Sequence, residues 1–349
     1  MTRILVTGAN GHVGTNTVRS LLKRNYEVVP FVRTTSDLRG LAPMNLTYAY
    51  GDVMDKDSLL AAAEGCDAII HTAAVYQYWA KDPDDIMKPA LVGTNNVFNV
   101  AKEMGIERVI YTSSVWAIGL STDPNVVLTV KDWNTASLNP YAVAKTKAEK
   151  EAWKLSEELG VPMISICPNG IFGPYNYRLT PSSIILRDII NGTQITFEAG
   201  FAFIDARDVG EIHALAVTEG ELGNRYITSG ENLSVRKLGE LIGKLTGYTP
   251  RYMGLGRTSF SLMAGMAELA GNMTNSEPML TRAFVHDTVQ RYMYTNCQDT
   301  WDTFNYQPRS LEVMLSDAIR WLLYIGEIKE DRASAIANDF PPLPEWVSA

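Results

Sequence analysis

A glycine-rich turn between an apolar strand and a helix constrains the fold of this 349-residue chain more than any other feature. The turn reads TGANGHVG over Thr7–Gly14 and directly follows the apolar segment Arg3–Thr7. Glycine has no Cβ, so the backbone can turn sharply there and approach a pyrophosphate closely. A helix that opens at once presents free N–H groups and the positive end of its dipole to an anion. We therefore predict a dinucleotide-binding turn. Its expected contacts are Gly8, Asn10, Gly11, His12, Val13 and Gly14, with His12 lending its backbone rather than acting as a catalyst.

Short apolar runs alternate with segments of helical spacing throughout the first half of the chain. Strands are predicted at 3–7, 27–33, 46–51, 67–71, 108–112 and 162–167, and helices at 13–23, 56–64, 84–104 and 141–159. Strands that alternate with helices imply right-handed βαβ units and a parallel sheet covered on both faces. The predicted fold class is α/β, with a doubly wound parallel sheet of the Rossmann type.

The alternation breaks down after Cys167, where proline and glycine crowd a loop over 168–181. Two short strands are expected at 203–205 and 225–228, on either side of a helix over 209–217, and the tail from 233 is mainly helical. We predict that residues 1–167 and about 200–230 form the cofactor-binding domain. Residues 168–199 and 231–349 would then form a smaller, mainly helical substrate domain.

Two stretches of the second half stand out by composition. Residues 253–293 contain six methionines, which suit either an adaptable helical core or a mobile wall over an apolar substrate. The segment Pro341–Pro344, which reads PPLP, is expected to be an extended tail.

The overall composition excludes several classes of function. The chain has 31 Lys and Arg against 39 Asp and Glu, a formal charge of −8, which argues against a nucleic-acid partner. Three separated cysteines and four histidines without metal-ligand spacing predict neither a disulfide framework nor a metal site. No apolar run approaches the roughly 18 residues of a membrane helix, and the N-terminus shows no signal pattern. We expect a cytoplasmic protein without a membrane span.

A proton-transfer pair is predicted at the start of the helix over 141–159. Tyr141 and Lys145 lie four residues apart, so both side chains project from one face. A free tyrosine has a pKa near 10, and a neighbouring ammonium group lowers it. Ser114 ends a predicted strand, at the sheet edge where a doubly wound fold binds its ligand. We predict that Tyr141 transfers a proton to a substrate oxygen held by Ser114, and that Lys145 tunes Tyr141 and holds the nicotinamide ribose.

The end of the second strand indicates which nicotinamide cofactor is used. NAD sites usually place a carboxylate there for the ribose 2′-hydroxyl. This chain has Arg33 instead, and its first carboxylate is Asp37. Because a guanidinium can pair with a 2′-phosphate in a bidentate manner, we predict NADP(H) rather than NAD(H).

Together these motifs resemble the extended branch of the short-chain dehydrogenase/reductase superfamily. The resemblance spans about residues 3–215, with a further similarity near the C-terminus. It rests on Thr7–Gly14, Gly51–Val53, His71–Ala74, Gly93–Asn95, Thr112–Ser114, Tyr141–Lys145, Pro168–Pro174, Phe203–Asp208, and Phe304–Pro308 followed by Trp321.

The resemblance implies roles by position. Asp52 and Val53 would flank the adenine, the stretch after the fourth strand would line the cofactor, and Pro168 to Ile171 would cover the nicotinamide. Asp208 would have a structural role. The implied cofactor residues outside the turn are Arg33, Asp52, Val53, Thr72, Ala73, Ala74, Thr112, Lys145, Pro168 and Ile171. A homodimer is possible by the same resemblance.

Within the superfamily, the chain looks most similar to dihydroflavonol reductases, cinnamoyl-CoA reductases and yeast-type aldehyde reductases. The implied activity is an NADPH-dependent reduction of a small or medium carbonyl compound. The predicted substrate contacts are Tyr76, Tyr78, Trp79, Ser114 and Asn169. Tyr76, Tyr78 and Trp79 offer flat apolar faces to an aromatic or acyl group, although loop packing would explain them equally well.

Three alternatives remain open. The first is a nucleotide-sugar epimerase or dehydratase with tightly bound NAD, but its usual asparagine is replaced by Ala90, and the usual arginine of the sixth-strand motif by Cys167. The second is a hydroxysteroid-dehydrogenase-like lipid enzyme. The third is a non-catalytic NADP(H) sensor, which the presence of both Tyr141 and Lys145 disfavours. The cinnamoyl-CoA reductase signature is also absent.

Overall fold

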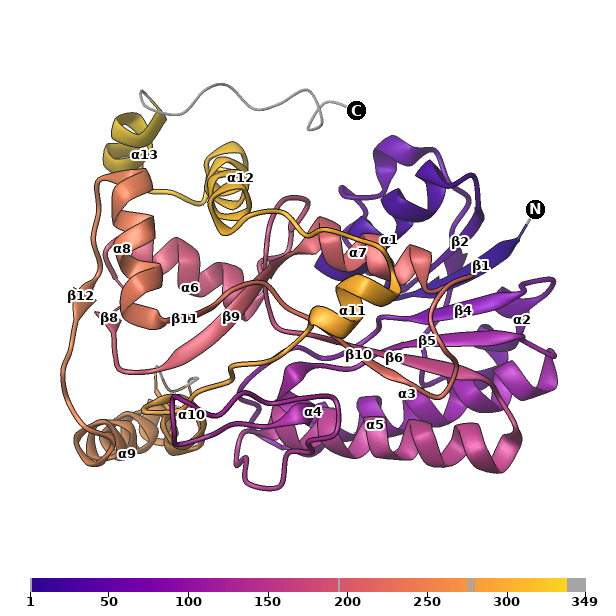
Figure 1. Ribbon diagram of the computed structural model, residues 1–349, viewed down its shortest axis with the longest axis horizontal. Coiled ribbons are helices and arrows are strands. Elements are labelled where there is room, and N and C mark those ends of the chain that lie inside the picture. The colour runs from indigo at the N-terminus through magenta and orange to yellow at the C-terminus, as the bar shows by residue number, and fades with distance from the viewer. Residues whose placement is uncertain (1, 194, 275, 277, 279, 338–349) are drawn as a thin grey trace.

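Seven parallel strands form the central sheet of the computed structural model, which describes residues 2–193, 195–274, 276, 278 and 280–337 (Figure 1). The strand order is β10-β6-β5-β4-β1-β2-β3, and every neighbouring pair is parallel. The order runs outward in both directions from β1 and β4, which is a doubly wound topology. The predicted fold class is therefore confirmed. The strands are β1 (Arg3–Thr7), β2 (Glu27–Val32), β3 (Ala49–Tyr50), β4 (Ala68–His71), β5 (Arg108–Thr112), β6 (Met163–Pro168) and β10 (Arg225–Thr228).

Helices cover both faces of this sheet (Figure 1). One layer contains α1 (His12–Lys23) and α7 (Ala206–Leu215); the other contains α2 (Lys56–Ala63), α3 (Asp84–Glu103) and α5 (Pro140–Leu159). Successive side chains of a strand point to opposite faces. Accordingly, Ile4 and Val6 join the core beneath α1, while Leu5 joins the core beneath α3.

Several predicted boundaries shift by a few residues, and two shift for a physical reason. Of the predicted strand 46–51, only Ala49–Tyr50 pairs with β2, at the edge of the sheet. The helix predicted at 209–217 begins at Ala206, because the Asp205 side chain accepts a hydrogen bond from the Arg207 N–H and caps it. The strand before it lengthens to β9 (Gly200–Asp205) and pairs outside the central sheet.

The remaining elements form a mainly helical region with two small sheets. One sheet has the order β11-β9-β7 and the other pairs β12 with β8. The division of the chain into two domains stays a prediction. The strands here are β7 (Gly170–Phe172), β8 (Ile195–Thr196), β11 (Asn232–Ser234) and β12 (Arg251–Tyr252). The helices are α4 (Val115–Ile118), α6 (Pro181–Ile190), α8 (Val235–Thr246), α9 (Arg257–Thr274), α10 (Arg282–Thr288), α11 (Gln298–Thr303), α12 (Leu311–Tyr324) and α13 (Glu330–Ala337), besides a short 3₁₀ turn at Ala42–Met44.

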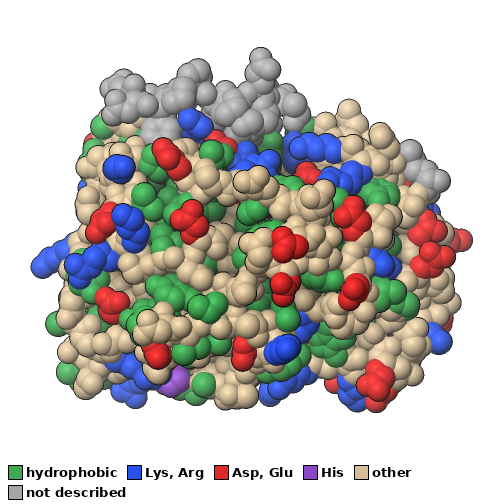
Figure 2. Space-filling view, viewed as in Figure 1, with side chains coloured by type: hydrophobic (Ala, Val, Ile, Leu, Met, Phe, Trp, Pro, Cys, Tyr) green, Lys and Arg blue, Asp and Glu red, His purple; other side chains and the backbone are tan. Residues whose placement is uncertain are grey.

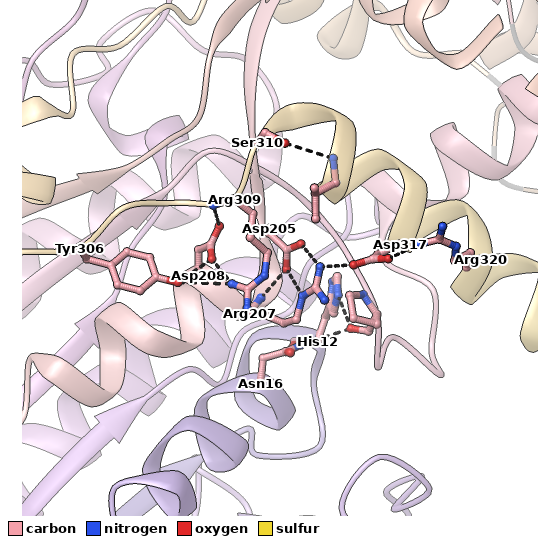
Figure 3. Close-up of polar contacts among 12 residues, drawn as sticks. His12, Asn16, Asp205, Arg207, Asp208, Tyr306, Arg309, Ser310, Asp317 and Arg320 are labelled. Atoms are coloured by element: carbon pink, nitrogen blue, oxygen red, sulfur yellow. Dashed lines mark hydrogen bonds and ion pairs between the residues drawn. The ribbon is translucent and has the colours of Figure 1, made fainter. Parts of the chain in front are cut away.

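A buried ion cluster joins α7 to the tail (Figure 3). Asp208 accepts hydrogen bonds from the Tyr306 hydroxyl at 2.7 Å, from the Arg309 backbone N–H at 2.9 Å and from the Arg309 guanidinium. Arg207 bridges Asp205, at 2.6 Å, and Asp317 of α12, at 2.7 Å. We call these residues the α7 cluster. Their contacts give Asp208 the structural position that the resemblance implies.

The methionine-rich stretch is not uniformly buried. Met293 is buried, whereas Met266 and Met273 on α9 are 60% and 81% exposed. The core interpretation is therefore wrong for these two side chains, which lie on the solvent face of α9. Met279 and the proline segment 341–344 lie outside the described residues.

The distribution of surface charge and the hydrophobicity of the helices relate to the expectations about nucleic acids and membranes. On the face drawn in Figure 2, acidic and basic side chains are interspersed without a continuous basic area. Among the described residues, no helix is both long enough and apolar enough to cross a bilayer.

Candidate active site

The glycine-rich turn adopts a conformation that only glycine tolerates. Gly8 has φ +67°, and a Cβ there would lie 2.7 Å from the Ala73 backbone. A Cβ on Gly14 would collide with the Gly8 carbonyl oxygen and lie 2.8 Å from the Ala9 Cα. These contacts let the turn, the start of α1 and the end of β4 lie close together.

The N-terminus of α1 matches the requirements of a pyrophosphate. Its N-cap residue, Gly11, has no side chain that could satisfy the first N–H groups, and the first turn contains no acidic residue. The first N–H groups of a helix have no intrahelical acceptor. The turn is thus a cradle for an anion, and the residues present fit the phosphates of a dinucleotide.

His12 has a structural use that the sequence did not reveal. Its imidazole is buried, and Nε2 donates a hydrogen bond to the Pro174 carbonyl oxygen at 3.1 Å. Asn16 donates to the same oxygen at 3.3 Å (Figure 3). Burial lowers the pKa of His12 to about 4. The neutral side chain therefore connects the glycine-rich turn to the loop after β7.

The ends of β4 and β5 carry two threonines that brace the site. Thr72 donates its hydroxyl to the Thr7 carbonyl oxygen at 2.7 Å, and so joins β4 to β1. The Thr112 hydroxyl lies 2.8 Å from Nε2 of His213 on α7. Their side chains therefore hold the backbone of the site, and direct cofactor contact by either residue stays a prediction.

Ser114, Tyr141 and Lys145 come together at the carboxyl end of β5. Ser114 caps α4, and its hydroxyl accepts a hydrogen bond from the Trp116 N–H at 3.3 Å. Tyr141 and Lys145 project from the first two turns of α5, and both line one small cavity with His71 and Tyr111. The Lys145 ammonium donates to the Thr112 carbonyl oxygen at 2.8 Å. The predicted triad is thus assembled in space, while its catalytic role stays a prediction.

The electrostatic setting of the triad is dominated by burial. Burial raises the pKa of Tyr141, and a hydrogen bond with Ser114 opposes that rise. Burial also lowers the pKa of Lys145 to about 8, against the opposing effect of Glu149. An ammonium with a pKa near 8 remains mostly charged at neutral pH and can still exchange a proton.

The start of α5 is fixed by a cap that sequence analysis missed. The Asn139 side chain accepts hydrogen bonds from the N–H groups of Tyr141, at 2.9 Å, and Ala142. The buried Asp287 carboxylate in turn accepts from the backbone of Asn139 at 2.8 Å. An asparagine followed by proline at the first helical position is the sequence signal that could have revealed this cap.

Two tyrosines of the loop after β4 cover Tyr141. The Tyr76 ring lies 4.7 Å from the Tyr141 ring, centroid to centroid, and the Tyr78 ring lies 6.0 Å away. The Tyr76 hydroxyl is 2.9 Å from that of Tyr78 and 3.0 Å from the Ser182 hydroxyl. The loop therefore lies where a substrate would reach Tyr141.

The neighbouring cavity has a volume of about 270 Å³ and borders the same loop. Six of its eight lining residues are apolar or aromatic, and Glu268 and Thr281 are the polar ones. The lining residues are Tyr78, Trp79, Leu138, Pro140, Glu268, Pro278, Thr281 and Ala283.

Asn169 lies apart from this apolar lining. Its side-chain amide donates to the Ser229 hydroxyl at 3.2 Å and to Met293 and Thr295. Its Oδ1 accepts from the Gly170 N–H at 2.9 Å. Because these bonds occupy the amide, its role as a substrate contact stays a prediction.

The adenosine end of the predicted site is open to solvent. Arg33 follows β2 with an exposed side chain, and no side-chain partner for it is found among the described residues. Asp37, the nearest carboxylate, is already held by Arg39 in a bidentate ion pair. Whether this end of the site binds a 2′-phosphate or a ribose hydroxyl stays a prediction.

Asp52 and Val53 border the same end of the sheet. Asp52 accepts a hydrogen bond from the Met54 N–H at 2.9 Å. Val53 packs against Gly93 of α3, where a Cβ would lie 3.0 Å from its Cγ2. At the nicotinamide end of the predicted site, Pro168 is the last residue of β6. Ile171 is half-buried and packs against the core beneath α7.

The sequence model of a protein family, described as the NAD dependent epimerase/dehydratase family, matches residues 4–228. The chain belongs to this family. It is one of the extended short-chain dehydrogenases/reductases, as the motifs predicted, and the reductase branch is represented among its relatives.

Two curated relatives and one crystal structure are similar over most of the chain. Sterol demethylase protein B of Methylococcus capsulatus is 32% identical over 247 residues, covering 70% of this chain and 74% of the relative. Cinnamoyl-CoA reductase 1 of Petunia hybrida is 31% identical over 265 residues, covering 71% and 78%. The crystal structure of gox2253 has a TM-score of 0.82 at 31% identity, covering 94% of this chain and all of that one.

More distant structures share only the fold. Yeast methylglyoxal/isovaleraldehyde reductase Gre2, complexed with NADPH, has a TM-score of 0.73 at 20% identity and covers 94% of this chain. The same match covers 100% of the Gre2 chain. Thermus thermophilus UDP-glucose 4-epimerase, complexed with NAD, also has a TM-score of 0.73, at 18% identity, covering 92% of this chain and 98% of its own. The fold is therefore compatible with either nicotinamide cofactor.

Proposed function

We propose that this protein is an NADP(H)-dependent reductase of an apolar or aromatic ketone or aldehyde. The observation that carries the proposal is the grouping of Ser114, Tyr141 and Lys145 at the carboxyl end of β5, beside a turn that fits a pyrophosphate. The cofactor, when bound, supplies the hydride for such a reduction. The protein supplies orientation, a proton and the surrounding charges.

Each member of the triad has a separate task in this proposal. Ser114 donates a hydrogen bond that orients the carbonyl oxygen, and Tyr141 donates the proton to that oxygen. Lys145, charged at neutral pH, lowers the energy of the tyrosinate that Tyr141 becomes. The lysine lies against the end of β5, where it is also placed to hold a ribose hydroxyl.

The preference for NADP(H) rests on Arg33. Its side chain is exposed at the end of β2, where the 2′ position of an adenosine ribose would lie. A guanidinium at that place favours a 2′-phosphate over a hydroxyl. The same chemistry supports reduction as the working direction.

The substrate class is inferred from the loop after β4. The rings of Tyr76 and Tyr78 pack around Tyr141, and Trp79 lines the cavity beside them. Flat or acyl-bearing groups are suited to such surfaces. A sterol-like ketone is a second candidate, favoured by the 32% identity to the sterol demethylase protein.

The proposal is tested by NADPH consumption with a panel of carbonyl compounds. The panel contains aromatic aldehydes, diketones, flavanonols, acyl-CoA esters and a 3-ketosterol. We expect turnover of one class, with a kcat/KM ratio that favours NADPH over NADH. Tightly retained NAD and turnover of a nucleotide diphosphate sugar would instead identify an epimerase.

A further inference from the structure

Glu149 is a fully buried carboxylate one turn beyond Lys145. Tyr141, Lys145 and Glu149 follow one another at intervals of four residues and therefore share one face of α5. Glu149 is 0% exposed. An acidic side chain is almost never so deeply buried unless it is paired, so its partners decide what it does.

Both carboxylate oxygens of Glu149 are saturated with hydrogen bonds. Oε2 accepts from the Ser113 hydroxyl at 2.6 Å and from Arg225 Nη2 at 3.0 Å. Oε1 accepts from the Ser165 hydroxyl at 2.7 Å and from Arg225 Nε at 2.8 Å, with Trp153 at 3.3 Å. We call this set the α5 cluster.

The partners come from three neighbouring strands. Ser113 directly follows β5, Ser165 lies in β6 and Arg225 begins β10. These strands are consecutive in the sheet. Ser113 also directly precedes Ser114, so the carboxylate fixes the face of α5 that carries Tyr141 and Lys145 relative to the strand end that carries Ser114.

Arg225 is itself held rigidly. Its Nη1 donates to the carbonyl oxygens of Val130, at 2.7 Å, and Asp132, at 2.8 Å, and its guanidinium lies 3.8 Å above the Trp133 ring. Its side chain is only 8% exposed. A buried ion pair is rarely more stabilising than apolar residues of the same volume. A gain in stability therefore does not by itself explain why the Glu149–Arg225 ion pair lies next to the triad.

The other titratable groups around Lys145 are uncharged. Burial lowers the pKa of His71 to about 3 and that of His213 to about 4. Burial raises the pKa of the Cys167 thiol to about 12, and burial also raises the pKa of Tyr111 and of Tyr141. Among these groups, drawn from β4, β5, β6, α5 and α7, Glu149 is the anion that acts electrostatically on Lys145 from the next turn of α5, and Arg225 of β10 pairs with it.

We propose that Glu149 is a positioning residue for the proton transfer, which supplies the counter-charge behind Lys145 and locks Ser113 against α5. The inference rests on the proposed function of the triad. Glu149 would act through Lys145 and the strand end, without touching the substrate itself.

Removing the negative charge has a defined consequence. Burial holds the pKa of Lys145 at about 8, and Glu149 acts in the raising direction. Glu149→Gln keeps the size of the side chain and loses the charge, so the pKa of Lys145 falls further. Lys145 then loses its proton at a lower pH, and the alkaline limb of the kcat/KM profile moves to lower pH by about 1 unit or more.

The test combines that pH profile with an NMR titration of Lys145 in the full-length protein. Lysine labelled with ¹³C at Cε reports the charge of Lys145 directly, with Lys145→Arg to assign the signal. Glu158→Gln is the matched control, because Glu158 is exposed on the same helix. We expect the titration midpoint of Lys145 to fall by about 1 unit in Glu149→Gln and to stay unchanged in Glu158→Gln.

Two outcomes would overturn the proposal. One is an unchanged Lys145 midpoint in a folded Glu149→Gln protein. The other needs no variant: a Lys145 side chain that is already neutral at pH 7 in the wild type would show that the carboxylate does not keep it charged. Because the titration requires no substrate, failure of the reductase proposal would appear separately, as absence of turnover with a normal Lys145 titration.

Discussion

The two faces of the central sheet each bury an ion cluster, and the two clusters differ in what they hold. The α5 cluster joins three consecutive strands behind Tyr141 and Lys145. The α7 cluster joins the start of α7 to the segment before α12 and to α12 itself (Figure 3). Carboxylate–guanidinium pairs thus hold the candidate catalytic residues in place on one face of the sheet. On the other face they hold α12 and the segment before it against α7.

The two clusters can therefore be tested separately, because changes in each should alter a different measured quantity. Changes in the α7 cluster should lower the free energy of unfolding and leave the pH profile of the reaction in place. Changes in the α5 cluster should move the pH profile of the reaction, as argued for Glu149.

Asp208→Asn should lower the free energy of unfolding. It removes the charge that faces Arg309, while Tyr306 and the Arg309 N–H lose their anionic acceptor. Breaking a buried pair costs about 3 kcal/mol, and partial exposure of Arg309 reduces this to about 2 kcal/mol. Urea unfolding measures it. An Asp208→Asn protein with wild-type stability and a shifted alkaline limb of the kcat/KM profile would contradict the separate roles of the two clusters.

His12 gives a pH-dependent effect on stability from the same face of the sheet. Its pKa is about 4 in the folded protein because of burial, against 6.5 for the free side chain. The unfolded chain therefore binds more protons between these values, and stability is lost as the pH falls from 6.5 towards 4. His12 contributes a slope of about 1.4 kcal/mol per pH unit in this window.

His12→Gln keeps a donor for the Pro174 carbonyl oxygen and removes the titration. Its free energy of unfolding should therefore depend less on pH between 6.5 and 4 than that of the wild type, in urea titrations at several pH values. Equal slopes for the two proteins would contradict the burial of a neutral His12.

Arg33→Ala should leave both clusters intact. Loss of one charged hydrogen-bonding group at an exposed site should raise the KM for NADPH about tenfold and leave the KM for NADH unchanged. Arg39→Ala is the matched control, since that guanidinium is already paired with Asp37. Equal NADPH affinity in Arg33→Ala and wild type would refute the predicted cofactor preference.

The central sheet and its helices could be predicted because their signals are local. Hydrophobic periodicity gave the alternation of strands and helices along the chain, and the glycines indicated a sharp turn, where Gly8 has a positive φ. The Tyr141–Lys145 spacing placed both side chains on one helix face. None of these inferences needed knowledge of distant contacts.

The packing of the second half of the chain depends on contacts between distant segments. Gly200 and Ser121 both pair with Tyr292, and Leu128 pairs with Thr295. Such bridges leave no periodic trace in the sequence. The exposed Met266 and Met273 illustrate the same limit, because a methionine-rich helix reads alike whether its face is covered or open.

The α5 cluster shows why part of the site was also missed. Glu149 continues the register of Tyr141 and Lys145, which was a usable signal. Its meaning depends on Arg225, 76 residues further along the chain. A buried acidic side chain can be identified only when its partner is known.

The central claim is that Tyr141 donates the proton in an NADPH-dependent carbonyl reduction. The most direct test is kcat for Tyr141→Phe on the substrate found in the panel, with Tyr226→Phe as the control, because Tyr226 is a buried tyrosine that does not line the cavity of the triad. We predict a fall in kcat of about 10²- to 10⁴-fold for Tyr141→Phe, with NADPH binding retained, and a near-normal kcat for the control. A Tyr141→Phe enzyme with near-normal kcat would contradict the assignment.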